Sequence, residues 1–182
     1  MTRPSKIPIR SLCLTGIFTA IITVCAQVSI PMPYGVPLTL QTLAIPLAGI
    51  VLGANLGALS VSVYVLLGAI GVPVFAGLTG GIGVILGPTG GFILSFPAIA
   101  SIAGIGERLG GKLSYALGII TGIIVNYLCG MLFFCLVTSN DMKTAFLACV
   151  LPFIPSDVIK MSAAAVLGKS IKRALKNSAL PT

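Results

Sequence analysis

The sequence predicts an all-α membrane protein, a bundle of six transmembrane helices with both termini in the cytoplasm. Of its 182 residues, 57% are hydrophobic and only 8% are charged, whereas about a quarter of the residues of a soluble domain are charged. The mean hydropathy is +1.14, so too few polar residues remain to cover a water-exposed surface. The positions of the apolar runs and of the charges then predict the number of helices and their orientation.

Apolar runs mark the expected helices, since a membrane-spanning helix needs about 20 such residues. Four runs meet or approach this length: residues 11–30, 90–105, 113–137 and 145–167. The first lacks a cleavage site followed by a polar chain, so we interpret it as a helix and not as a signal peptide. A fifth run, 38–70, is too long for one span and is interrupted at Gly53-Ala54-Asn55. Because Gly and Asn favour turns, we expect two short helices there and six in total.

The distribution of charge supports an even number of spans in one domain, residues 1–182. With six spans, two basic tails (1–10 and 169–182) and the connection after the fourth span share one side. Because cytoplasmic loops carry an excess of Lys and Arg, this side is expected to be the cytoplasm. It holds nine basic residues and one acid: Arg3, Lys6, Arg10, Glu107, Arg108, Lys112, Lys169, Lys172, Arg173 and Lys176. The other side holds only Asp141 and Lys143.

Two segments between the helices are expected to form an outward-facing cavity. Residues 31–42 read PMPYGVPLTLQT, and residues 71–91 are apolar yet contain eight glycines. Non-helical backbone at membrane depth is tolerated only where protein buries it or where it lines a cavity. An ordinary disordered loop is the alternative, although loops are usually polar.

Two opposite charges stand three residues apart in the apolar segment IPSDVIKM, residues 154–161. Asp157 and Lys160 would project from one face of a helix, and charges within a span usually mark a substrate or ion path. Pro155 suits a first helical turn, so the helix is expected to begin there, after an extended or separately helical approach. The pair suits a ligand with a carboxylate, N–H groups and an apolar body. A self-neutralising pair that only fixes helix packing is the alternative.

Several classes of chemistry find no support in the sequence. The chain has no His and only one carboxylate within a span, which argues against an enzyme. Five cysteines lie in or beside apolar runs and are expected to act as small hydrophobes. Residues 163–170 end in Gly-Lys-Ser but lack the first glycine of a P-loop, so we expect no ATP hydrolysis. We expect membrane lipid around the chain, and no cofactor, no metal ion and no nucleic-acid partner.

Four motifs together resemble the BioY family, the biotin-binding substrate-capture (S) components of energy-coupling-factor (ECF) transporters. They are PLTLQTLAIPLAGIVLG (37–53), LGAIGVPVFAGLTGG (67–81), GPTGG (87–91) and PSDVIK (155–160). The resemblance covers about residues 16–167. It implies six helices, biotin uptake across the plasma membrane, a site near the outer face that includes Asp157 and Lys160, and a lid formed by residues 31–42.

Chemical inference and the resemblance together suggest further roles. We expect Lys160 to pair with the biotin carboxylate and Asp157 with the ureido ring. Lys160→Ala should therefore weaken the binding of biotin more than the binding of an analogue without the acid. Further candidate ligand contacts are Tyr34, Gln41, Thr79 and Asn126. The family's Ala-x-x-x-Ala pattern, which docks on a transmembrane coupling subunit, reads Gly16-Ile-Phe-Thr-Ala20 here. The implied complex adds that subunit and two ATP-binding-cassette ATPases. Capture of another vitamin, a structural packing subunit and a membrane-embedded enzyme remain as alternatives.

Overall fold

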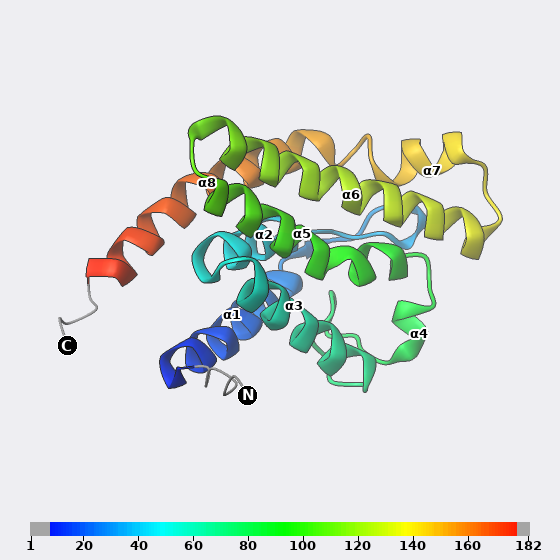
Figure 1. The fold of residues 1–182 in the computed structure, drawn as a ribbon. Coiled ribbons are helices and arrows are strands. Elements are labelled where there is room, and N and C mark those ends of the chain that lie inside the picture. The colour runs from blue at the N-terminus through cyan, green and yellow to red at the C-terminus, as the bar shows by residue number, and fades with distance from the viewer. Residues whose placement is uncertain (1–7, 178–182) are drawn as a thin grey trace, which may run out of the picture.

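The computed structural model describes residues 8–177, a helical bundle with one short hairpin (Figure 1). In chain order the elements are α1 (Ile9–Gln27), β1 (Ser29–Ile30), the 3-10 turn η1 (Pro33–Gly35), β2 (Leu38–Thr39), α2 (Gln41–Leu52), α3 (Ala54–Ala69), α4 (Ile82–Ile85), α5 (Gly90–Leu109), α6 (Lys112–Thr138), α7 (Met142–Cys149) and α8 (Ile154–Asn177). The all-α membrane class is therefore confirmed.

The helices correspond to the predicted spans, although not all are long. By length and apolar composition, three helices of the described chain could cross a membrane: α1, α5 and α6. The bent pair of α7 and α8, with 54° between the two helices, passes the same test when the two are taken together and counts as a fourth span if it crosses as one. The remaining two predicted spans are α2 and α3, of 12 and 16 residues. They meet at Gly53, whose φ of +84° suits glycine because it lacks a Cβ.

The core forms where α5 packs against α6 on one side and against α2 and α3 on the other. Close contact of α2 and α5 requires a glycine, because a Cβ on Gly49 would lie 1.9 Å from the carbonyl oxygen of Ala100. Helix α1 packs on α2 and α3, and the Thr19 hydroxyl lies 3.1 Å from that of Ser60 at this contact. Helix α8 packs mainly on α2.

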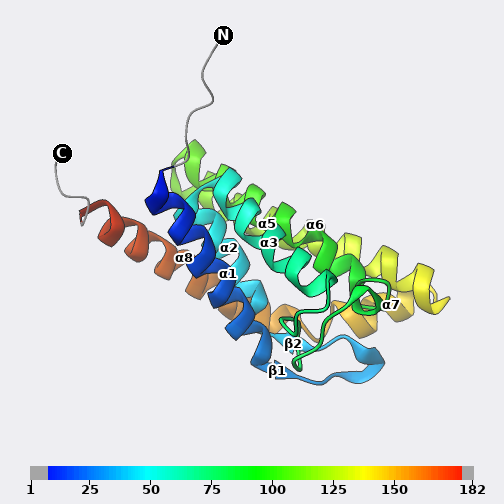
Figure 2. The same cartoon turned by 90° about the horizontal axis from the view of Figure 1, so that it is seen from below.

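The two ends of the bundle differ in charge. The start of α1, the α5–α6 turn and the end of α8 lie at one end, whereas the α6–α7 connection lies at the other (Figures 1 and 2). This arrangement puts most basic residues of the described chain at one end, as an even number of spans requires, while Lys143 in α7 lies at the other end and Lys160 is buried between them. Helix α8 continues to Asn177, so the first part of the predicted tail 169–182 is helical. Residues 1–7 and 178–182 lie outside the described part of the chain.

The break between α7 and α8 lies where the sequence predicted a separate approach to the charged pair. Helix α7 begins after Asp141, whose Oδ1 accepts a hydrogen bond from the Thr144 backbone N–H at 3.2 Å. Hydrogen bonding with Thr144, first through its side chain and then through this backbone N–H, lowers the pKa of the Asp141 carboxyl. After α7 the chain turns, and α8 starts at Ile154 with Pro155 in its first turn. Asp157 and Lys160 consequently occupy the first two turns of α8.

Candidate ligand-binding site

The predicted pair is an ion pair inside the bundle. Lys160 Nζ lies 2.5 Å from Asp157 Oδ1, as expected for positions i and i+3 of a helix. Asp157 is 2% exposed and Lys160 is 6% exposed. Two buried opposite charges lose much hydration, and their attraction offsets this loss only where further hydrogen bonds satisfy them.

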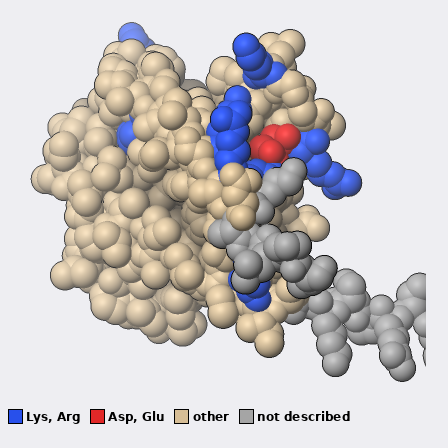
Figure 3. All heavy atoms as spheres, turned by 90° about the vertical axis from the view of Figure 1, so that its left-hand side faces the viewer, with Lys and Arg blue, Asp and Glu red and all other residues tan. Residues whose placement is uncertain are grey.

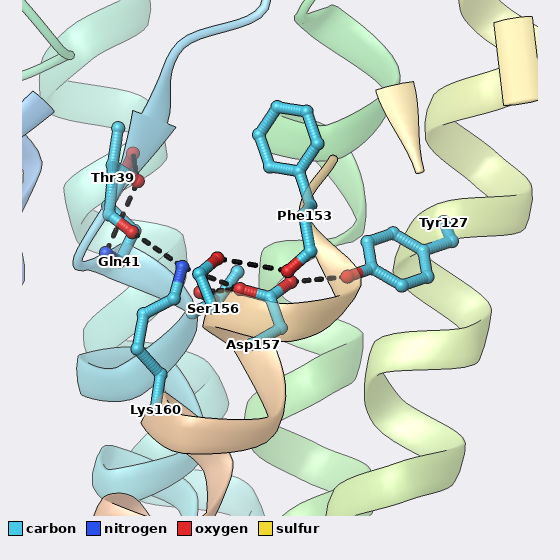
Figure 4. Close-up of polar contacts among 8 residues, drawn as sticks. Thr39, Gln41, Tyr127, Phe153, Ser156, Asp157 and Lys160 are labelled. Atoms are coloured by element: carbon cyan, nitrogen blue, oxygen red, sulfur yellow. Dashed lines mark hydrogen bonds and ion pairs between the residues drawn. The ribbon is translucent and has the colours of Figure 1, made fainter. Parts of the chain in front are cut away.

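Other elements supply those hydrogen bonds (Figure 4). The Tyr127 hydroxyl of α6 donates to Asp157 Oδ2 at 2.5 Å, and the Thr42 hydroxyl of α2 donates to Oδ1 at 2.8 Å. Lys160 Nζ donates to the backbone carbonyl of Thr39, in β2, at 2.9 Å. The pair on α8 is thereby connected to α2, α6 and the hairpin. Such a fully bonded polar network holds its members in one arrangement.

A second polar chain fixes the hairpin beside the pair. The Gln41 side-chain oxygen accepts from the Thr39 hydroxyl at 2.9 Å, and its Nε2 donates to the Tyr64 hydroxyl at 2.8 Å. The Tyr64 hydroxyl in turn lies 3.2 Å from the carbonyl oxygen of Val74 and donates to it. Gln41 thus joins β2, α3 and the segment after α3. Its side-chain oxygen and one of its two amide N–H groups are thus used within the protein.

A cavity of about 260 Å³ opens onto the ion pair. Its volume is slightly below the roughly 300–1,000 Å³ usual for small-molecule sites, so it suits a small ligand. Aromatic and aliphatic side chains form most of its wall, and the polar side chains beside them include the ion pair, two amides and several threonines. The lining residues are Gly35, Val36, Pro37, Thr39, Gln41, Thr42, Phe75, Ala76, Thr79, Val84, Thr89, Phe92, Ile93, Phe96, Asn126, Tyr127, Cys149, Phe153, Asp157 and Lys160. Both inter-helical segments expected at a cavity, 31–42 and 71–91, contribute to it.

The structure brings most of the predicted site residues together. Beside the charged pair, Gln41, Thr79 and Asn126 line the cavity. Asn126 is buried, and its Oδ1 lies 2.8 Å from the Ser95 hydroxyl, which donates to it.

Tyr34 is not among the lining residues. Its side chain is 59% exposed, while the next residues, Gly35 and Val36, reach the cavity. The physical reason is the backbone of Tyr34, whose φ of +67° turns the chain within η1. The prediction of a ligand contact at Tyr34 therefore has no support in this arrangement.

Sequence reasoning missed the hydrogen-bonding partners of the ion pair. Thr42 follows Gln41 and Tyr127 follows Asn126, each beside a residue that was singled out for its polarity. A hydroxyl within an apolar helix was the available signal, but many such hydroxyls bond only to their own helix. Thr15 and Thr23, for example, each donate to the carbonyl four residues earlier.

The predicted docking pattern lies on the outer face of α1. Gly16 and Ala20 are exposed, and a Cβ on Gly16 would have no atom within 4 Å. Large apolar side chains on the same face, Ile17 and Val24 among them, are also exposed.

Metal ligands do not cluster in the part of the chain that the structure describes. No group of three or more His, Cys, Asp or Glu side chains within residues 8–177 could hold a metal ion.

The fold and the site define a multi-pass membrane protein with a small, mostly apolar cavity that encloses one ion pair. The chain belongs to the BioY family, whose model matches residues 1–177. It is 42% identical over 163 residues to the probable biotin transporter BioY of Pyrococcus horikoshii, a match that covers 90% of this chain and 96% of that one. It is 40% identical over 176 residues to the biotin transporter BioY of Rhodobacter capsulatus, with 89% and 93% covered.

A solved structure has the same fold. The S-component for biotin from an ECF-type ABC transporter matches with a TM-score of 0.85 and 24% identity, over 94% of this chain and 95% of that one. The helical arrangement described above is therefore that of an S-component.

Proposed function

We propose that this protein captures biotin at the outer face of the plasma membrane, as the substrate-specific component of an ECF-type transporter. The observation that carries the proposal is the buried Asp157–Lys160 pair, which lines a cavity of about 260 Å³. The names of the relatives and of the matching structure support biotin as the ligand. The protein acts as a binding subunit and not as an enzyme.

The geometry favours a different ligand placement from the one expected from the sequence. The charged atoms of Asp157 and Lys160 are 2.5 Å apart, so one small ligand group must meet both. A carboxylate on Lys160 would bring a second negative charge next to Asp157, which is unfavourable in a buried site. The ureido group instead offers a carbonyl acceptor for Lys160 and an adjacent N–H donor for Asp157.

With the ureido ring on the pair, the rest of biotin fills the apolar part of the cavity. The ring system would contact aromatic walls such as Phe92 and Phe153. The four-carbon chain would then carry the carboxylate away from Asp157, toward the segment that begins at Gly35. This placement gives the ureido ring and the apolar body of biotin partners of matching chemistry.

Uptake requires partners that supply energy. We infer a transmembrane coupling subunit and two ATP-binding-cassette ATPases, with docking through the exposed face of α1 at Gly16 and Ala20. Both residues are small, so a partner helix could approach closely. The predicted cytoplasmic position of both termini would put the basic end of the bundle on the ATPase side.

Calorimetric titration of the purified protein tests the ligand. Biotin should bind far more tightly than thiamine, which has no ureido group and no carboxylate. If thiamine binds as tightly as biotin, the protein captures a different vitamin and the biotin proposal fails.

A double replacement separates a ligand site from a packing device. Asp157→Leu with Lys160→Met removes both charges together, so neither is left buried and unpaired. We expect a folded protein, judged by its thermal unfolding, that no longer binds biotin. Unchanged biotin binding would mean that the pair serves packing alone.

A further inference from the structure

A second hollow lies at the opposite end of the bundle from the ligand cavity. It has a volume of about 460 Å³ and lies between the α5–α6 turn and the last turns of α8. We call it the basic groove. Its lining residues are Ile50, Glu107, Gly110, Gly111, Lys112, Tyr115, Lys169, Lys172 and Arg173. On this face, basic side chains gather around a single acidic one (Figure 3).

The basic groove carries an excess of positive charge. Four of its lining side chains are cationic and one is anionic. Lys172 forms an ion pair with Glu107, which uses the only carboxylate of the groove. The Lys169 ammonium lies 4.3 Å from the centre of the Tyr115 ring, a cation–π contact that leaves its charge in place. Lys112 and Arg173 are exposed, and neither forms a salt bridge within the described residues.

Backbone groups add to the positive potential. Gly110 and Gly111 form the turn with φ values of +75° and +80°, and α6 begins directly after them at Lys112. No side chain caps this helix start. The first N–H groups of a helix lack partners within the helix, and its dipole favours an anion at that end. The charged side chains and the helix start therefore favour the same kind of ligand.

The surroundings of the basic groove indicate an anion attached to a hydrocarbon. Ile50 and Tyr115 are buried apolar residues at its base, and Leu109 and Leu113 flank the α5–α6 turn with exposed side chains. The groove lies at helix ends, the level at which basic side chains meet lipid headgroups. Basic pockets between membrane helices on the cytoplasmic side commonly hold anionic headgroups. A free anion would gain nothing from the exposed leucines.

We propose that the basic groove binds the headgroup phosphate of an anionic phospholipid, with Lys112 and Arg173 as its free cations. The acyl chains would lie along the exposed leucines of the α5–α6 turn. This site does not depend on the biotin proposal, because none of its residues lines the ligand cavity.

Native mass spectrometry of the purified full chain tests the proposal. The protein is released from detergent after incubation with equal amounts of phosphatidylglycerol and phosphatidylcholine, and the retained lipid is identified. We expect phosphatidylglycerol to be retained in clear preference. Lys112→Gln with Arg173→Gln should weaken its retention about 30-fold, since each basic residue near an anionic lipid contributes about a factor of five.

Matched variants exclude trivial explanations. Lys143→Gln removes a positive charge at the other end of the bundle and should leave retention unchanged. Arg173→Lys keeps the charge and should reduce retention by less than about threefold. Because Lys112 and Arg173 are exposed and form no salt bridge with any described residue, the double variant should unfold at the wild-type temperature.

Four results would overturn the proposal. The first is equal retention of the two lipids by the wild type. The second is an undiminished preference of the double variant for phosphatidylglycerol. This result would count against the proposal even if the double variant lost the binding of a protein partner. The third is an equal loss in Lys143→Gln. The fourth is displacement of the lipid by inorganic phosphate at matched ionic strength, which would assign the groove to a free anion.

Discussion

Replacing Lys160 by Met would test the placement of biotin on the ion pair. Met keeps most of the apolar stem and removes the ammonium, which lies 2.5 Å from Asp157 and 2.9 Å from the carbonyl oxygen of Thr39. The variant would lose the hydrogen bond from the ammonium to the ureido carbonyl, and a hydrogen bond that involves a charged group contributes about 1.5–3 kcal/mol. Asp157 would still accept hydrogen bonds from Tyr127 and Thr42, which keep it in place. A loss of about 1.5–3 kcal/mol corresponds to a roughly 10- to 150-fold weaker Kd.

The assay compares two ligands by calorimetric titration, biotin and its methyl ester. The ester keeps the ureido ring and lacks the negative charge. If Lys160 donates to the ureido carbonyl, the substitution should weaken the binding of both ligands, and the two factors by which Kd rises should agree within about threefold. Lys143→Met, at an exposed lysine that is not among the lining residues of the cavity, should weaken the binding of neither ligand.

A large loss for biotin with little loss for the ester would refute this reasoning. Lys160 would then meet the carboxylate, as the sequence alone suggested. Unchanged affinity for both ligands would exclude Lys160 from the site altogether.

Three further predictions concern the support of the site. Tyr127→Phe removes the 2.5 Å hydrogen bond to Asp157. It should weaken the binding of biotin about tenfold in calorimetric titration, since a hydrogen bond to a charged group contributes about 1.5 kcal/mol or more. Gln27 forms hydrogen bonds with segment 74–78, part of which lines the cavity, through both its amide nitrogen and its oxygen. Gln27→Ala should therefore speed biotin dissociation in stopped-flow measurements. An unchanged dissociation rate would mean that the segment keeps its position without Gln27. Gly49→Ala would force α2 away from a backbone carbonyl of α5 and should lower stability by about 1–3 kcal/mol, seen as a lower unfolding temperature. Gly16→Ala meets no atom within 4 Å and should leave that temperature unchanged or raise it slightly, since Ala favours a helix interior more than Gly does. Equal shifts in the two variants would contradict the packing argument.

The helices were largely predictable because their signals are local. Apolar runs long enough for the bilayer identified α1, α5 and α6, and the break at Gly53 coincides with a backbone conformation that favours glycine. The start of α8 followed from Pro155, and the contact of Asp157 with Lys160 followed from helical spacing. Each of these features depends on residues that are close together in the sequence.

The partners of the pair could not be predicted, because they lie far away in the sequence. Thr42 is 115 residues from Asp157 and Tyr127 is 30 residues away. No periodicity shows which hydroxyl on one helix will face a carboxylate on another. The expected carboxylate contact of Lys160 rested on matching chemical groups alone, since the sequence does not show what else surrounds the two charges.

The scarcity of charge makes the position of each charged residue informative. Most charged side chains of the described chain lie near helix ends, whereas Asp157 and Lys160 lie inside the bundle. A buried ion pair is often no more stabilising than apolar residues of similar size, so stability alone gives little reason for this pair. The double variant Asp157→Leu with Lys160→Met is therefore expected to be at least as stable as the wild type. Its predicted loss of biotin binding would then show that the ion pair is present for the ligand and not for the fold.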